Sequence, residues 1–195
     1  MSISLAGKVC LITGASSGIG AATAIKFANL GANVAISGRN EQALKDTVEK
    51  CAKASGGKSQ VHCIVADLAS AADRERLVSE SVKYFGKLDC LVNNAGILYM
   101  GSVEAPNVME QYDKIMEVNT KAPLHLMNLA VPHLIATKGT VVNVSSVNGI
   151  RAVCDSFFVF LSCNNLCFLS LTSSLDSSRI IHQKQLWTKL RLVQL

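Results

Sequence analysis

A glycine-rich turn, TGASSGIG at residues 13–20, places the strongest constraint on the fold. It follows a short apolar run, KVCLIT, and precedes an amphipathic stretch, so the order strand, turn, helix is predicted. The glycines allow a tight turn, close approach of the backbone to a phosphate, and close packing of helix on strand. The N–H groups at the start of the helix would then face a pyrophosphate. The turn therefore predicts a dinucleotide-binding unit, and a flexible surface turn is the alternative.

Short apolar runs and longer amphipathic stretches alternate up to residue 146. Strands are predicted at 8–13, 33–37, 60–66, 88–93 and 139–145. Helices are predicted near 18–30, 41–55, 70–85 and 108–136. Near-continuous apolar strands favour a sheet covered on both faces, and helical crossovers favour parallel strands. We expect an α/β fold with a doubly wound parallel sheet of the Rossmann type, truncated after the fifth strand.

Composition places the chain among globular proteins with one core. It has 195 residues, of which 49% are hydrophobic and 17% charged, and this size and balance suit a single folded domain. The net charge of +5 is scattered, with 15 Lys and Arg against 12 Asp and Glu in residues 1–152. No block of like charge indicates a nucleic-acid partner.

The cysteines indicate a reducing environment. The chain has 7 Cys and no CxxC pair, and Cys10, Cys63 and Cys90 fall inside apolar runs where a thiol acts as a small hydrophobe. We expect no metal site and a cytoplasmic location. The N-terminus lacks a basic stretch followed by a long apolar one, so no signal peptide is expected.

Further motifs follow the glycine turn in a fixed order: Asp67 after the third predicted strand, NNAG at 93–96, Asn119 in MEVNT, and NVSS at 143–146. Together with the turn they resemble the short-chain dehydrogenase/reductase family, over residues 5–152. The resemblance implies an NAD(P)-binding Rossmann domain over residues 1–152. It also implies hydride transfer between a nicotinamide and the carbonyl/alcohol pair of a small-molecule substrate.

The same resemblance indicates how a cofactor would be held. Asp67 would hydrogen-bond the adenine amino group, and Asn93 would help to hold the central strands and the cofactor. The expected cofactor-binding residues are Gly14, Ser16, Ser17, Gly18, Ile19, Gly20, Arg39, Asp67, Leu68, Asn93, Ala95 and Gly96.

The end of the second predicted strand favours NADP(H) over NAD(H). An acidic residue there would bind the ribose 2′-hydroxyl of NAD, but this chain has Ser37-Gly38-Arg39-Asn40. The planar, charged guanidinium of Arg39 suits a 2′-phosphate. A solvated Arg39 is the alternative, and it leaves the missing acid unexplained.

The family's catalytic arrangement, as the resemblance implies it, consists of Asn, Ser, Tyr and Lys. Ser polarises the substrate oxygen, Tyr transfers its proton, Lys lowers the pKa of the Tyr, and Asn positions a water. Asn119 and Ser146 match; for Ser146 the alternative is capping of the loop after the strand. A Tyr is expected about thirteen residues after Ser146, in PGxxxYxxxK, yet position 159 is Val and the last tyrosine is Tyr112. The sequence thus contains half of the arrangement.

Residues 153–195 form a tail outside the family pattern, which we expect to be irregular or poorly ordered. Read one base out of frame, permitted codons for residues 173–189 encode Phe-Pro-Gly-x-x-x-Tyr-x-x-Ser-Lys-Ala-Ala-x-Asp. Val153 can supply a splice donor and Ser173 an acceptor. Removing the 20 codons and two bases between them puts a Tyr thirteen residues after Ser146. We therefore interpret the tail as a translated intron.

This interpretation leaves two functional hypotheses. One is an NADP(H)-dependent oxidoreductase whose Tyr-Lys half is missing from this chain, so that turnover is absent or severely impaired. The other is a non-catalytic nucleotide-binding fragment or an unstable, mis-spliced product. In either case the fifth strand would be left as an edge and the family's homo-oligomer interface would be incomplete. A membrane anchor at 157–171 is disfavoured, because the segment is short and has Asn164-Asn165 at its centre.

Overall fold

The computed structural model describes residues 4–99, 101–102 and 104–146. The predicted tail and the alternative anchor at 157–171 lie outside these residues. The strands are β1 (Val9–Ile12), β2 (Asn33–Gly38), β3 (Val61–Val65), β4 (Cys90–Asn93) and β5 (Thr140–Asn143). The helices are α1 (Gly18–Asn29), α2 (Glu41–Ser55), α3 (Ala71–Phe85), α4 (Val108–Met116), a π-helical turn η1 (Glu117–Lys121) and α5 (Ala122–Thr137).

The strands form one parallel sheet in the order β3-β2-β1-β4-β5. The predicted doubly wound parallel sheet is therefore confirmed. The chain winds outward from β1 to β3 and then returns to place β4 on the other side of β1. At such a reversal the loops after the two central strands diverge and leave a crevice at the carboxyl ends of the strands.

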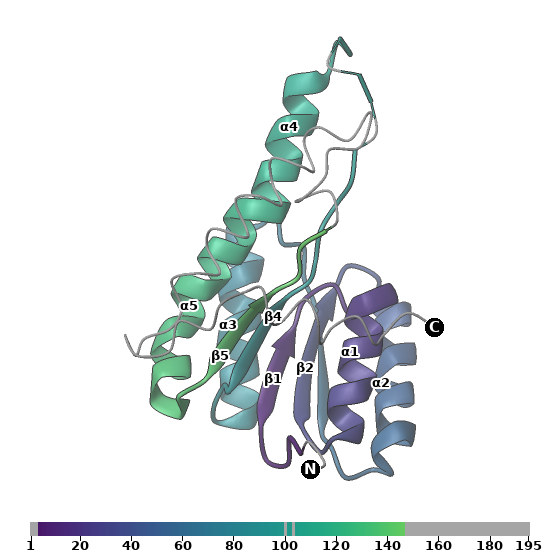
Figure 1. The fold of residues 1–195 in the computed structure, drawn as a ribbon, viewed down its shortest axis with the longest axis vertical. Helices are drawn as coiled ribbons and strands as arrows, with labels where there is room; N and C mark the ends of the chain where they lie inside the picture. The colour runs from purple at the N-terminus through teal and green to yellow at the C-terminus, as the bar shows by residue number, and fades with distance from the viewer. Residues whose placement is uncertain (1–3, 100, 103, 147–195) are drawn as a thin grey trace.

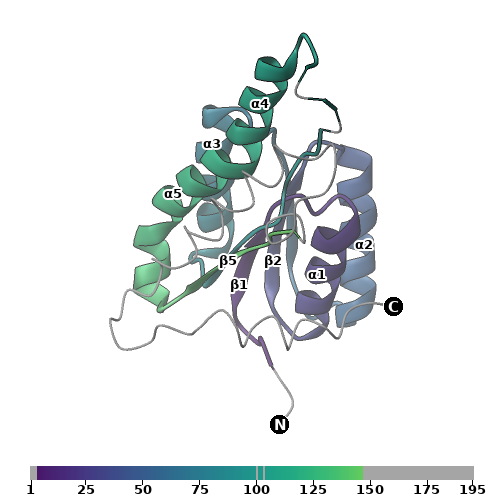
Figure 2. The same cartoon turned by 45° about the horizontal axis from the view of Figure 1, so that its top comes forward.

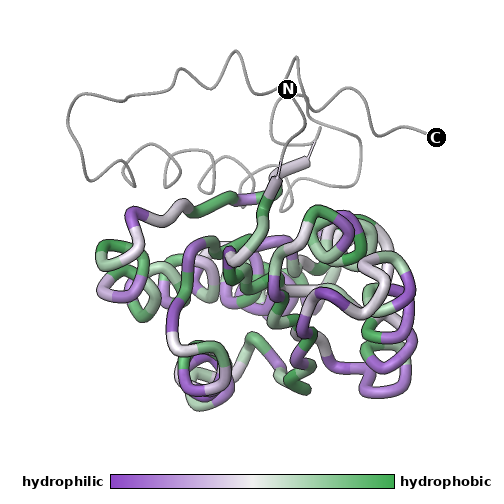
Figure 3. The backbone as a smooth tube through the Cα atoms, turned by 90° about the horizontal axis from the view of Figure 1, so that it is seen from below, coloured by the Kyte–Doolittle hydropathy of each residue, from purple (hydrophilic) through white to green (hydrophobic). Residues whose placement is uncertain are grey.

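Helices cover both faces of the sheet, as the apolar strands predicted (Figures 1 and 2). On one face Ala24 of α1 and Leu44 of α2 belong to a buried cluster with Ile12 and Ile36. On the other face α3 and α5 pack through a second cluster that includes Leu77 and Leu126. Hydrophilic residues lie on the outward turns of the helices (Figure 3), whereas all four residues of β1 are buried.

The predicted single helix near 108–136 is interrupted. Between α4 and α5 the backbone forms one π-helical turn, Glu117–Lys121, and α4 extends beyond the sheet while α5 packs on it (Figure 1). Hydrophobic periodicity does not reveal an inserted residue of this kind, because the apolar residues on either side still recur at helical spacing. Asn119 lies in this turn and is buried.

Side chains and glycines fix the ends of the two helices that flank β3. The side chain of Asn40 accepts a hydrogen bond from the backbone N–H of Ala43, at 3.0 Å, and so caps α2. Ser70 caps α3 in the same way through Asp73 N–H, at 3.3 Å. Both helices end at a glycine in the left-handed conformation, Gly56 and Gly86. These ends place the loops before α2 and α3 beside the carboxyl ends of β2 and β3.

Candidate functional site

The glycine turn joins β1 to α1 and leaves space that larger residues would fill. Gly14 has φ +66°, and a Cβ there would lie 2.8 Å from the Cα of Ala95. A Cβ at Gly20 would overlap the carbonyl oxygen of Gly14. Helix α1 begins after Ser17 with no acidic residue in its first turn. The turn therefore holds the start of a helix, with its positive dipole end, close to the backbone of the loop after β4.

Thr13 and Asn94 fasten the glycine turn to that loop. The hydroxyl of Thr13 accepts hydrogen bonds from the N–H groups of Asn94 and Ala95, both at 3.0 Å. The amide of Asn94 donates to the carbonyl oxygens of Thr13, at 2.9 Å, and Gly14, at 3.2 Å. Sequence reasoning assigned no role to Thr13 or Asn94. Their position next to the predicted Gly14 and Asn93 was the available signal, but only the pairing of β1 with β4 shows what they bind.

Asn93 ends β4 opposite Asn143 of β5. Its Nδ2 donates to Oδ1 of Asn143 at 2.8 Å, so Asn93 links β4 to β5, the last strand of the described sheet. Its Oδ1 is buried and has no hydrogen-bond partner among the described residues. The same holds for the hydroxyl of Ser37, next to the last residue of β2. A buried oxygen without a partner is costly in a folded protein, so the hydroxyl of Ser37, which lines the crevice described below, suits a site that gains a polar ligand.

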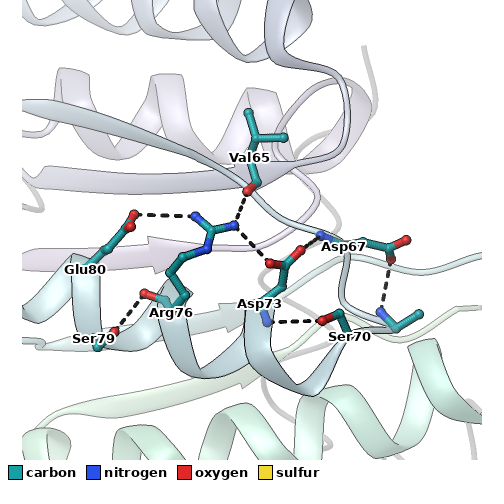
Figure 4. A network of polar contacts seen from close by, with 8 residues as sticks. Val65, Asp67, Ser70, Asp73, Arg76, Ser79 and Glu80 are labelled. Atoms are coloured by element: carbon teal, nitrogen blue, oxygen red, sulfur yellow. Dashed lines mark hydrogen bonds and ion pairs between the residues drawn. The ribbon is translucent and has the colours of Figure 1, made fainter.

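Asp67 lies in the loop after β3, and α3 holds this loop from below (Figure 4). The carboxylate of Asp73 accepts a hydrogen bond from the N–H of Asp67 at 2.8 Å. Arg76 donates to the carbonyl of Val65 at 2.6 Å and to Asp73 at 3.0 Å. The N–H of Asp67 and the guanidinium of Arg76 together lower the pKa of Asp73. The side chain of Asp67 itself accepts from Ala69 N–H at 3.0 Å.

Arg39 follows β2 and lines the same crevice as Ala95. It makes no hydrogen bond or ion pair with the other described residues, whereas its neighbour Asn40 is engaged in capping α2. The backbone at Gly38 passes close to Ser16, since a Cβ on Gly38 would lie 3.2 Å from the side chain of Ser16. Arg39 and the glycine turn therefore border the same space.

Asn119 holds the segment that follows β4. Its Oδ1 accepts from the N–H of Ile97 at 2.8 Å, and its Nδ2 donates to the carbonyl of Ile97 at 2.9 Å. The side-chain amide thus pairs with one residue's backbone in the manner of a neighbouring strand. The π turn exposes Val118 to the crevice on one side and directs Asn119 to Ile97.

Ser146 lies three residues beyond the end of β5 and is half-buried. Val144, between the strand and this serine, donates its N–H to the carbonyl of Asn93 at 2.8 Å. This bond continues the pairing of β5 with β4 past the last strand residue. Ser145 and Ser146 are therefore carried to the carboxyl edge of the sheet, the same edge that holds the glycine turn.

A single crevice of about 330 Å³ collects most of the predicted cofactor residues. Those lining it are Gly14, Ser16, Ser17, Arg39, Asp67, Leu68, Ala95 and Gly96. Six residues that sequence reasoning did not assign also line it: Ser37, Gly38, Ala66, Asn94, Ile97 and Val118. Six predicted residues lie outside its lining: Gly18, Ile19, Gly20, Asn93, Asn119 and Ser146. Of these, Gly20 packs against the lining residue Gly14, and Asn93 ends β4, whose following loop lines the crevice.

Two further observations concern the described residues alone. No group of three or more His, Cys, Asp or Glu side chains is placed there to hold a metal ion. Among the helices of that part of the chain, none has both the length and the apolar character needed to cross a bilayer.

Comparison with known proteins matches residues 8–156 to the short chain dehydrogenase family. An uncharacterized oxidoreductase from Thermotoga maritima is 45% identical over 148 residues, which cover 75% of this chain and 57% of that protein. 11-beta-hydroxysteroid dehydrogenase A from Sesamum indicum is 35% identical over 142 residues, covering 73% and 40%. The chain thus spans about half the length of these curated relatives.

Solved structures share the fold. A metagenomic short-chain oxidoreductase in complex with NADP superposes with a TM-score of 0.75 and 34% identity, covering 86% of this chain and 75% of that one. NAD⁺-bound xylitol dehydrogenase gives a TM-score of 0.80 and 28% identity, covering 88% and 65%. The two structures carry different nicotinamide dinucleotides, so the comparison does not discriminate between these cofactors.

Proposed function

The chain belongs to the short chain dehydrogenase family, and on that premise we propose that residues 1–152 are the NADP(H)-binding domain of an oxidoreductase acting on a carbonyl/alcohol pair. The observation that carries the proposal is the crevice at the reversal of strand order. It brings together the glycine turn, the Asp67 loop and the loop after β4. In this proposal each of the three segments binds a different part of the dinucleotide.

The crevice fits such a cofactor in shape and in polarity. The absence of a side chain at Gly14 keeps the start of α1 open to a pyrophosphate, which the N–H groups of Ser16 and Ser17 would bind. The hydroxyl of Ser37, without a partner among the described residues, is available to a ligand in the same space. Asp67 would accept a hydrogen bond from the adenine amino group.

We assign the choice of NADP(H) to Arg39. It borders the crevice at the end of β2, where no carboxylate is present to bind a ribose 2′-hydroxyl. Its guanidinium makes no hydrogen bond or ion pair with other described residues, so binding a 2′-phosphate breaks no existing ion pair. NAD(H) is the second candidate cofactor. The two differ only in the 2′-phosphate, so a comparison of the affinities for NADPH and NADH distinguishes them.

When bound, the nicotinamide would supply or accept the hydride. The task of the chain's own residues is to hold the substrate oxygen and move its proton. Ser146, at the carboxyl edge of the sheet, would donate its hydroxyl to the carbonyl oxygen and stabilise the negative charge that develops there. Asn119, which the π-helical turn holds in position, would position a water. We assign no substrate, because fold and family do not specify one.

This chain contains no Tyr-x-x-x-Lys, so the proton donor of the arrangement is missing. Loss of a general acid lowers the rate by a factor of about 10² to 10⁴. We propose that the tail from Val153 is a translated intron, and that the spliced product joins Ala152 to Phe-Pro-Gly and regains the Tyr and Lys. The alternative function is a non-catalytic, nucleotide-binding fragment or a mis-spliced product.

The test compares binding with turnover. The 195-residue chain is titrated with NADPH and NADH, and NADPH oxidation is measured with a panel of ketones and aldehydes, beside a chain carrying the spliced continuation. We expect both chains to bind NADPH and the spliced one alone to turn over. Rapid turnover by the 195-residue chain contradicts the missing proton donor, and a transcript without GT at codon 153 or AG at codon 173 contradicts the intron.

A further inference from the structure

Arg74 is a buried charge that the proposed reaction does not use. It lies in the first turn of α3, its side chain is 3% exposed, and α3 packs there against α5. A buried ion pair is often replaced by apolar residues of similar volume with no loss of stability. Stability alone therefore does not require an arginine at this position, and the contacts of its guanidinium indicate another role.

The guanidinium binds three acceptors: one in the loop before α3, one in the π-helical turn and one in α5. Nη1 donates to the carbonyl of Leu68 at 2.6 Å and to the carboxylate of Glu117 at 2.8 Å. Nε donates to Nδ1 of His125 at 3.1 Å. A rigid, planar fork of donors can hold three acceptors at fixed positions, which a lysine cannot.

Two of these three segments contribute residues to the lining of the crevice. Leu68 and Asp67 line it, and we call this pair the adenine lip. Glu117 begins the π turn, whose Val118 lines the crevice and whose Asn119 pairs with Ile97, also in the lining. We call Ile97 and Val118 the turn lip. Among the described side chains, Arg74 contacts both the loop of the adenine lip and the turn that carries the turn lip.

We propose that Arg74 is a positioning residue that sets the separation of the adenine lip from the turn lip. This proposal rests on the proposed function. The separation of the two lips decides how well a ligand that spans the crevice fits. A ligand that touches the adenine lip alone does not depend on it. Full NADPH spans both lips, whereas 2′,5′-ADP carries only the adenine, its ribose and two phosphates.

The chain offers a matched control in Arg76, two residues further along α3. Its side chain is 41% exposed and binds the Asp67 loop through Val65 and Asp73, with no contact to the π turn. Arg74→Met leaves Glu117 paired with Lys121, at 2.8 Å, so no buried charge loses its only partner. Both variants remove one guanidinium from the same helix, and only the first one cuts the link between the lips.

The test measures the dissociation constants of NADPH and 2′,5′-ADP for wild type, Arg74→Met and Arg76→Met. We expect Arg74→Met to raise the value for NADPH about tenfold and that for 2′,5′-ADP less than about twofold, as loss of a charged hydrogen bond predicts. Arg76→Met should change both values by the same factor. Equal factors for the two ligands in Arg74→Met, or no change in either, overturn the proposal.

Two provisions keep the outcome decisive. If Arg74→Met does not fold, Glu117→Ala breaks the same link at its partly exposed end, and the same comparison of ligands applies. If the wild-type chain binds neither ligand, the proposed function fails, and hydrogen exchange of the Ile97 amide tests the positioning role alone. A faster exchange in Arg74→Met supports the role, and an unchanged rate overturns it.

Discussion

The side-chain amide of Asn119 forms two hydrogen bonds with the backbone of Ile97, at 2.8 and 2.9 Å. One buried side chain therefore fixes the segment that leaves β4 and borders the crevice. The two residues are 22 positions apart, and the π turn places Asn119 opposite Ile97.

Asn119→Ala should lower the free energy of unfolding by about 1–3 kcal/mol, because the N–H and C=O of Ile97 lose their partner in a partly buried place. Urea denaturation measures this. Asn128→Ala is the control, since Asn128 is an exposed asparagine on α5. A change no larger in Asn119→Ala than in the control would show that the pairing does not stabilise the fold.

Gly14→Ala and Gly18→Ala separate backbone strain from close packing. Both glycines have positive φ, +66° and +56°, but a Cβ at Gly18 meets nothing within 4 Å, whereas one at Gly14 meets Ala95. We expect Gly18→Ala to cost about 1 kcal/mol of stability, and Gly14→Ala to cost about 1–3 kcal/mol more from overpacking. Chemical denaturation gives both values. Equal costs would mean that the loop after β4 moves aside freely.

Arg39→Gln should weaken NADPH by about 10- to 100-fold, the loss expected for charged hydrogen bonds to a phosphate, and leave NADH within about twofold. Titration of the cofactor's fluorescence measures both affinities. Lys53→Gln removes the same charge from an exposed position at the far end of α2 and serves as the control. An equal loss for NADPH and NADH would exclude Arg39 as the 2′-phosphate ligand.

The Asp73 carboxylate should make stability depend on pH. The backbone N–H of Asp67, followed by Arg76, lowers the pKa of Asp73 in the folded state. A carboxyl whose pKa is lowered by folding adds stability above its unfolded pKa, and that stability is lost as the pH falls through the lowered value. We expect wild type to exceed Asp73→Asn in stability near neutral pH, and the difference to shrink below pH ~3.9. Urea denaturation from pH 7 to pH 2.5 follows it, and a difference that stays constant would contradict the assignment.

Local pattern predicted the architecture well. The glycine turn and the alternation of apolar runs with amphipathic stretches placed five strands and the helices between them. Strands buried on both faces must be almost entirely apolar, and the helices that cover them must be apolar on one face. The interruption at Glu117–Lys121 was missed, since a single inserted residue in a helix leaves the apolar spacing nearly intact. Residues of the glycine turn could be assigned for the same local reason: a positive φ or a close approach admits only a small side chain.

The supporting contacts of the site depend on the order of the strands in the sheet. Thr13 meets Asn94 across 81 positions, and Arg74 meets Glu117 across 43 and His125 across 51. No periodicity encodes such pairs, because they form only when β4 returns beside β1 and α5 packs on α3. Residue type and local spacing thus specified a nucleotide-binding turn and a parallel sheet, while the packing of distant segments selected which polar side chains hold that turn in place.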